Sequence, residues 1–170
     1  GARQPMFNDV ALTADGGFYS TEMYNIMTPF EQVAAAGVEG KDTGVVWHWT
    51  ADSGFAPVAG SVGSFPNGIV INDAEDTLYV NYWFSGLTIK LDINSGEVLA
   101  KHQGGRADNL TLADGAVWAA KHDVTFIEYA EGCPADSVNC FLPFSVYELA
   151  LEDLTEKNAW SFDSEIFGFG

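Results

Sequence analysis

The sequence predicts an all-β protein, because one motif rich in strand-forming residues occurs three times along the chain. The copies lie at residues 7–20, 65–82 and 107–120. Each begins with a polar Asn or Asp step, continues through an apolar strand and an acidic turn, and ends in a strand that carries an aromatic residue. The second and third copies are 41 positions apart, counted from Asn67 to Asp108. A repeat of about 40–45 residues with several short strands is typical of a β-propeller blade.

The length of the chain, 170 residues, limits how much of a propeller it can form. Propellers contain about 4–8 blades of four strands each, and this length provides about three to four of them. We expect one domain over residues 1–170, with blades at about residues 7–64, 65–106 and 107–166. The rest of the ring is expected to come from sequence outside this chain or from another chain. Self-association of partial rings stays open as an alternative.

Other segments are expected to complete the blades and connect their strands. Residues 44–50 and 55–58 predict an outer hairpin of the first blade, and residues 124–129 predict a strand of the third. The order Thr-Pro-Phe-Glu at residues 28–31 predicts a capping box with proline at the first helical position. A short helix is therefore expected there, ending at Gly37.

The composition argues against two classes of partner. Lys and Arg total 7 against 24 Asp and Glu, which gives a formal net charge of −17 and a pI near 4.1. Nucleic acids and anionic membranes both attract basic surfaces, so neither partner is expected. No apolar run reaches the ~18 residues of a membrane-spanning helix. The simplest interpretation of the charge is an acidic surface that keeps a secreted or salt-adapted protein soluble.

Two cysteines, Cys133 and Cys140, flank six residues of a turn-rich segment. An even number of cysteines at this spacing predicts a disulfide, with two free thiols as the alternative. A metal site at these cysteines is not favoured, because no histidine or further cysteine lies nearby in the sequence. A disulfide would suit a secreted, periplasmic or otherwise extracytoplasmic protein.

The polar step of each motif supplies candidate metal ligands. In a propeller the innermost strand of each blade lines the central channel, so equivalent residues of successive blades converge on one axis. These residues are Asn8 with Asp9, Asn67, and Asp108 with Asn109. Their carboxylate and amide oxygens favour Ca²⁺, Mg²⁺ or Mn²⁺ over zinc or copper. Alternatively, each Asn or Asp only stabilises its own turn.

Together these motifs resemble the serum paraoxonase/arylesterase family and its relatives, the gluconolactonase (senescence marker protein) and strictosidine synthase-like propellers. The resemblance rests on Asn-Asp-Val at residues 8–10, Pro-Asn-Gly-Ile at 66–69 and Asp-Asn-Leu at 108–110, followed by Trp118 and His122. It covers nearly the whole chain, as roughly the later half of a ring. The fold that it implies is a six-bladed β-propeller.

The resemblance also implies calcium as a cofactor. A catalytic calcium would be held by four residues of this chain, Asn8, Asn67, Asp108 and Asn109. A second, structural calcium would be held by Asp9. The family's remaining ligand, a glutamate, and its proposed base histidines have no counterpart in these 170 residues.

The acid-base groups of the chain match the family only in part. The family has an Asp-His pair where this chain has Glu22-Met23, which puts a proton shuttle through that pair in doubt. His122 matches a family histidine near the pocket mouth and is the catalytic candidate, to polarise a substrate or position water. A solvated histidine at a strand end is its alternative role. His48 is expected to pack or lie at the surface of an outer strand, and His102 to be exposed beside a Gly-Gly turn.

The function that these features predict is a calcium-dependent hydrolase of lactones or aryl esters, with a small-molecule ester or lactone as substrate. No Gly-x-Ser-x-Gly motif occurs, so a serine nucleophile is not supported. Tyr82, Trp83 and Phe84 would either wall an apolar pocket or pack between blades. Two other functions stay open: a non-catalytic, calcium-stabilised propeller that binds a partner, and a strictosidine synthase-like condensing enzyme.

Overall fold

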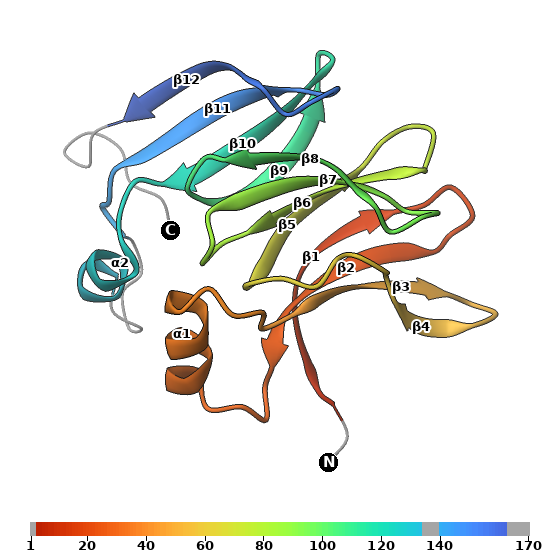
Figure 1. Cartoon of the computed structure of the whole chain (residues 1–170), viewed down its shortest axis with the longest axis horizontal. Helices are drawn as coiled ribbons and strands as arrows, with labels where there is room; N and C mark the ends of the chain where they lie inside the picture. Colours follow the sequence, from red (N-terminus) through yellow and green to blue (C-terminus); the bar gives the residue numbers. More distant parts are fainter. Residues whose placement is uncertain (1–2, 134–139, 163–170) are drawn as a thin grey trace.

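The computed structural model of the chain describes residues 3–133 and 140–162. Within these ranges it contains twelve strands and two helices. The strands form three antiparallel sheets of four strands each, which confirms the all-β class and its organisation into blades (Figure 1).

Each sheet is built from four consecutive strands that pair in chain order. The first sheet contains β1 (Pro5–Leu12), β2 (Phe18–Asn25), β3 (Val45–Thr50) and β4 (Gly54–Pro57). The second contains β5 (Pro66–Ile71), β6 (Thr77–Tyr82), β7 (Leu87–Asp92) and β8 (Val98–Gln103). The third contains β9 (Arg106–Ala113), β10 (Ala116–His122), β11 (Phe144–Ala150) and β12 (Glu156–Phe162).

The second sheet lies between the other two, and its inner strand β5 contacts both β1 and β9 (Figure 1). Every residue of β6 is therefore buried. Successive side chains of a strand point to opposite faces, so Leu78 and Val80 pack in the core shared with the first sheet. Tyr79 packs in the core shared with the third sheet, beside Val117 and Tyr147. The continuous apolar run of this strand thus serves two cores.

Each inner strand contains a β-bulge at its polar step, where two residues face one residue of the neighbouring strand. The register pairs Phe7 with Glu22 and Val10 with Ser20 in the first sheet, and the shift recurs in the other two. The bulged pairs and their single opposite residues are Asn8 and Asp9 with Thr21, Asn67 and Gly68 with Asn81, and Asp108 and Asn109 with Ala120. The three candidate steps are therefore structurally equivalent.

Hydrogen bonds tie each bulge to the next sheet. Thr21 Oγ1 donates to the carbonyl oxygen of Asn67 at 2.6 Å. At the equivalent place one sheet further on, Asn81 Nδ2 donates to the carbonyl oxygen of Asp108 at 3.2 Å. The carboxylate of Asp9 also accepts a hydrogen bond from the backbone N–H of Ile69 at 3.0 Å. These hydrogen bonds satisfy the backbone carbonyl oxygens of Asn67 and Asp108 and fix the relative positions of the three inner strands.

The first helix, α1 (Phe30–Val38), occurs where a helix is expected but begins and ends differently. Pro29 is the N-cap and no side chain caps the helix, so the predicted capping box at residues 28–31 is wrong. The helix also continues past Gly37, which is buried against the ring of Phe84. Gly37 therefore serves close packing and does not end the helix.

The second helix, α2 (Phe126–Gly132), replaces the strand predicted at residues 124–129. Thr125 is its N-cap and forms a capping box with Glu128: Glu128 N donates to Thr125 Oγ1 at 3.2 Å, and Thr125 N donates to Glu128 Oε2 at 2.7 Å. The pattern Thr-x-x-Glu was the sequence signal for this helix. Figure 1 shows α1 and α2 at the same end of the sheets.

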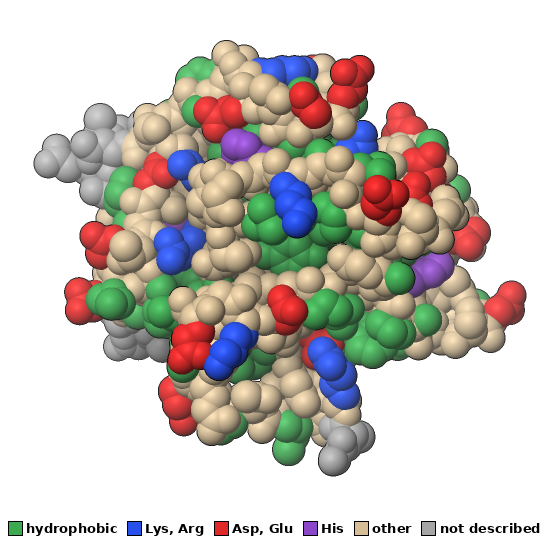
Figure 2. Space-filling view, viewed as in Figure 1, with side chains coloured by type: hydrophobic (Ala, Val, Ile, Leu, Met, Phe, Trp, Pro, Cys, Tyr) green, Lys and Arg blue, Asp and Glu red, His purple; other side chains and the backbone are tan. Residues whose placement is uncertain are grey.

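The surface agrees with the acidic composition. Asp and Glu side chains are spread over the face shown in Figure 2 and do not gather in one place. Among the described residues, no helix is long and apolar enough to cross a membrane.

At Gly68 the second and third sheets approach each other closely at a bulge, and this position provides a test of the packing. A Cβ at this position would collide with the carbonyl oxygen of Asp108. Gly68→Ala should lower the free energy of unfolding by about 3 kcal/mol, because β9 would have to move. Gly115→Ala is the control, since only its positive φ of 72° opposes a side chain, at a cost of about 1 kcal/mol. Equal losses in urea unfolding would contradict the close approach.

Tyr147 predicts a sensitivity of the fold to alkaline pH. Burial raises the pKa of Tyr147 to about 12, while its hydroxyl lies 3.4 Å from Thr88 Oγ1. Since the unfolded side chain has a pKa of about 10, the unfolded state loses a proton first, and stability falls between pH 10 and 12 by about 2–3 kcal/mol. Tyr147→Phe should show a smaller loss over this window in urea unfolding at several pH values. An unchanged loss would contradict the role of Tyr147.

Candidate functional site

A cavity of about 260 Å³ lies where the three bulges meet the two helices. Its lining residues come from all three sheets and from α1 and α2. The polar ones are Asn8, Asn67, Asp108 and His122. The remaining ones are apolar or aromatic, namely Met23, Phe30, Phe65, Trp83, Phe84, Phe126 and Tyr129. The cavity thus joins a polar group of residues to an aromatic wall.

Three of the predicted metal ligands, Asn8, Asn67 and Asp108, line this cavity together. Asn67 is only 5% exposed, and its Oδ1 atom is buried with no hydrogen-bond partner among the described residues. Burial raises the pKa of Asp108, and the negative charge of the nearby Asp9 raises it further. A hydrogen bond from Asn67 lowers this pKa and offsets part of the shift. A bound cation would give the buried Asn67 Oδ1 atom a partner among these described residues. It would also stabilise the charged form of the Asp108 carboxylate, which burial disfavours.

The other two predicted ligands, Asp9 and Asn109, occupy the second position of their bulges and lie outside this cavity. Both carboxylate oxygens of Asp9 accept backbone hydrogen bonds, from Val10 at 2.8 Å and from Ile69 at 3.0 Å. Asn109 is exposed and lines a neighbouring cavity of about 210 Å³, which it shares with Asp108 and His122. No cluster of three or more His, Cys, Asp or Glu residues occurs in the described part of the chain. A metal at the candidate site would therefore need amide oxygens.

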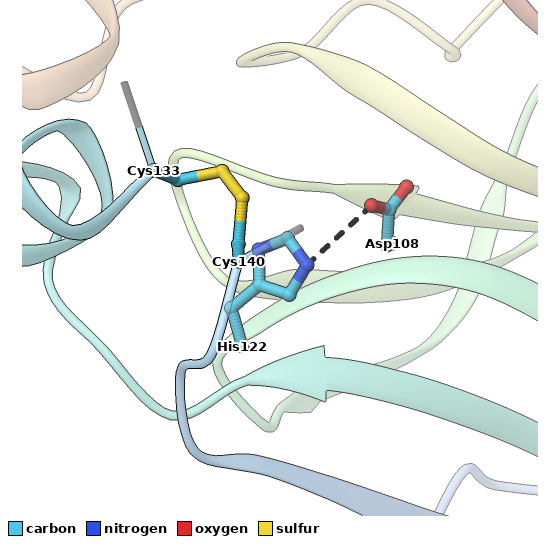
Figure 3. The surroundings of a disulfide bond; sticks show 4 residues. All are labelled: Asp108, His122, Cys133 and Cys140. Carbon is cyan, nitrogen blue, oxygen red and sulfur yellow. Dashed lines mark ion pairs between the residues drawn. A yellow bond between two sulfur atoms is a disulfide. The ribbon is translucent and has the colours of Figure 1, made fainter. Parts of the chain in front are cut away.

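His122 ends β10 and is 9% exposed, so it is not the solvated histidine of the alternative interpretation. Its Nδ1 atom accepts a hydrogen bond from Trp83 Nε1 at 3.2 Å. Its Nε2 atom lies 3.6 Å from Asp108 Oδ2. Figure 3 marks this contact with a dashed line. The ring of Tyr129 stacks on the imidazole, with centroids 5.1 Å apart and planes 12° from parallel. The side chain is thus held from three directions.

The same surroundings keep His122 uncharged. Burial lowers its pKa to about 4, and the positive charge of Arg106 contributes to this decrease. The negative charge of Asp123 has the opposite, smaller effect on the pKa. At neutral pH the imidazole is therefore neutral, and its contact with Asp108 involves no pair of opposite charges.

The aromatic wall is a connected cluster. The rings of Trp83 and Phe84 meet edge to face, with centroids 5.1 Å apart, and the ring centroids of Phe84 and Phe126 are 5.2 Å apart. Trp83 also contacts Tyr129 edge to face at 5.4 Å. Trp83 and Phe84 therefore line a pocket, as one of the two sequence interpretations proposes. Tyr82 instead follows the other interpretation, because it packs in the core between the first and second sheets. Phe126 and Tyr129 were missed as wall residues, because their segment was predicted to be a strand.

The pair Glu22-Met23 divides between the core and the cavity. Glu22 is fully buried, and its carboxylate accepts hydrogen bonds from Arg3 Nε at 2.9 Å and from Trp47 Nε1 at 2.6 Å. It does not line the cavity. Met23 does, and its sulfur accepts a hydrogen bond from Asn8 Nδ2 at 3.4 Å. The pair therefore presents no proton acceptor to the cavity.

The other two histidines lie away from the cavity. His48 stacks on Tyr19, with centroids 4.2 Å apart, in agreement with a packing role. His102 was expected to be exposed, and this is wrong: its side chain is 14% exposed and its ring lies 5.2 Å from that of Tyr147. The third sheet covers it, which the adjacent Gly-Gly pair did not reveal.

The disulfide expected between Cys133 and Cys140 is present, with Cα atoms 5.1 Å apart. Cys133 is the C-cap of α2, so the bridge fixes the end of the helix that carries Tyr129. Figure 3 shows the bridge beside His122. Both cysteines line the cavity of about 210 Å³ next to the candidate site.

Solved structures similar to this chain are β-propellers or contain related folds. A gluconolactonase from Xanthomonas campestris is 16% identical with a TM-score of 0.55, and the match covers 92% of this chain and 47% of the gluconolactonase. A luciferin-regenerating enzyme is 12% identical with a TM-score of 0.57, covering 92% of this chain and 46% of the enzyme. The Swd1 β-propeller domain from Myceliophteria thermophila is 11% identical with a TM-score of 0.52, covering 95% of this chain and 39% of that domain.

These similarities establish the propeller fold, and at such low identity they establish the fold alone. The chain spans less than half the length of each of the three chains. No protein-family model matches the sequence. No curated protein matches it either.

The disulfide provides a test of how the wall is supported. The double variant Cys133→Ser/Cys140→Ser should lower the free energy of unfolding by about 2 kcal/mol, because the unfolded chain regains the freedom of a short loop. Amide hydrogen exchange in α2 should also become faster, since the helix loses its anchor. The control is treatment with a reductant, which should reproduce the effect in the wild type and leave the double variant unchanged. Unaltered exchange in α2 would contradict an anchoring role.

Proposed function

We propose that this chain belongs to a calcium-dependent hydrolase of lactones or aryl esters. The observation that carries the proposal is the buried Oδ1 atom of Asn67, which has no hydrogen-bond partner within residues 3–133 and 140–162 and shares a cavity with Asp108 and Asn8. These residues occupy equivalent bulges, and their motifs resemble those of the paraoxonase/arylesterase family. The fold similarity to a gluconolactonase agrees with this proposal without specifying the activity.

Calcium is the proposed cofactor because the available ligands are hard oxygens. Asn8, Asn67 and Asp108 would hold the catalytic ion, with Asn109 following Asp108 on the same bulge. Asp9 is proposed for a second, structural ion. Calcium takes about 6–8 oxygen ligands, and Asp108 supplies the only charge among these four proposed catalytic ligands. Further ligands, including a carboxylate, would come from the remainder of the ring, outside this chain or in another one.

The chemistry proposed is attack of water on a carbonyl carbon. Bound calcium would supply a Lewis acid that polarises the carbonyl and stabilises the developing oxyanion. The aromatic wall would bind the apolar part of the ester and exclude bulk water. His122 would lie beside Asp108 as a neutral, orienting group. Among the described residues that line the cavity there is no glutamate, so the strictosidine synthase-like alternative has no acid here.

The approach to the site suits an apolar substrate. An open groove between α1 and α2 is lined by Phe30, Ala34, Val38 and Ile127 among others. Phe30 and Phe126 line both this groove and the cavity, so the two spaces adjoin. An ester or lactone with an aryl or alkyl group would therefore meet apolar surface before it reaches the carbonyl-binding side chains.

The disulfide supports an extracytoplasmic location for this enzyme. Disulfides persist in oxidising compartments such as the periplasm and the extracellular space. We therefore place the proposed hydrolase in a secreted or periplasmic setting, where calcium is also a suitable cofactor.

The proposal is tested on the whole protein with Asp108→Ala and Asn67→Ala. Both variants should bind calcium about 10–100-fold more weakly by calorimetry and should lose hydrolysis of phenyl acetate and of a simple lactone. Asp52→Ala is the control, since Asp52 is exposed in the β3–β4 turn. Wild-type hydrolysis that persists in a chelator would contradict the metal mechanism, and calcium binding unchanged in both variants would contradict the site. Calcium binding with no hydrolysis by the wild type would favour the non-catalytic propeller.

A further inference from the structure

The hydrogen bond between Trp83 and His122 defines which imidazole nitrogen carries the proton. An indole Nε1–H group is a donor only and cannot accept. It lies 3.2 Å from His122 Nδ1 and donates to it. Nδ1 must therefore present its lone pair, so the proton of the imidazole resides on Nε2. This assignment follows from the hydrogen-bonding capacity of the two side chains.

The packing of the ring keeps this arrangement in place. Tyr129 stacks on one face of the imidazole, and Trp83 meets it nearly at a right angle, at 76° with centroids 5.9 Å apart. Turning the ring over would replace Nδ1 by a carbon and leave the indole N–H without its acceptor in a buried site. Trp83 is itself held, because the guanidinium of Arg106 lies over its ring at 5.6 Å.

We propose that Trp83 is a positioning residue that fixes His122 as its Nε2–H tautomer, so that His122 serves the cavity as a hydrogen-bond donor and not as a proton acceptor. The tautomer stands on the Trp83–His122 geometry alone, whereas its use on an ester or lactone rests on the proposed function. A proton acceptor for water would then have to be another group.

The position of Nε2 shows what the donor can reach. It lies 3.6 Å from Asp108 Oδ2, so a small approach would complete a hydrogen bond that orients the carboxylate (Figure 3). Both His122 and Asp108 line the cavity. A substrate oxygen placed between the wall and Asp108 would meet the same N–H group. His122 thus either orients the carboxylate or polarises a bound oxygen, and in neither role does it transfer a proton.

The test is nitrogen NMR of the whole protein with labelled histidine, which distinguishes a protonated ring nitrogen from an unprotonated one. The wild type at neutral pH should show His122 as a single tautomer, with the proton on Nε2. In Trp83→Phe the aromatic ring is kept and the donor is lost, so this single pattern should give way to a mixture of tautomers or to the Nδ1–H form. Trp118→Phe is the matched control, because its indole bonds the carbonyl oxygen of Ala113, away from the cavity.

Each outcome of this measurement is decisive. A wild-type Nδ1–H tautomer or a charged imidazolium would overturn the assignment without any variant. An unchanged pattern in Trp83→Phe would overturn the positioning role. A change of equal size in Trp118→Phe would show a general loss of packing and would also overturn it. Because no turnover is needed, a protein that hydrolyses neither esters nor lactones would refute the proposed function and leave this test intact.

Discussion

The site depends on a β-bulge that recurs at one position in all three inner strands. At each bulge two residues of the inner strand face one residue of the neighbouring strand. The polar side chains therefore point in a different direction from those of a regular strand. Hydrogen bonds from Thr21 and Asn81 then tie the bulges to the adjacent sheets. Three copies of one local irregularity thereby bring Asn8, Asn67 and Asp108 into one cavity.

Burial of this cavity determines the chemistry that its groups can offer. Removal from water makes the carboxylate of Asp108 less acidic and leaves His122 neutral. The same burial leaves Asn67 Oδ1 without a partner in the described structure. An anion, an unpaired oxygen and a neutral donor together form surroundings that favour a cation over an acid-base pair. The aromatic wall contributes to this burial, because its side chains cover one side of the cavity.

The propeller itself does not decide the function, since related propeller folds support unrelated activities. The gluconolactonase and the Swd1 domain both match more than 90% of this chain, at 16% and 11% identity. The cavity of this chain combines amide and carboxylate oxygens on equivalent bulges with an aromatic wall to which both helices contribute. The proposed function therefore rests on these groups and their surroundings.

The sequence alone determined the all-β class, the three repeats and the polar step in each, because strand propensity and turn chemistry are local properties. It also indicated the disulfide, since Cys133 and Cys140 are close along the chain. Its apolar pattern at residues 124–129 favoured a strand where α2 forms, although the capping-box residues Thr125 and Glu128 are present in it. Only the tertiary structure decided that His122 is neutral, because its burial and the nearby charge of Arg106 result from packing between elements. Contacts between strands, and the burial that they cause, depend on packing that no local pattern specifies.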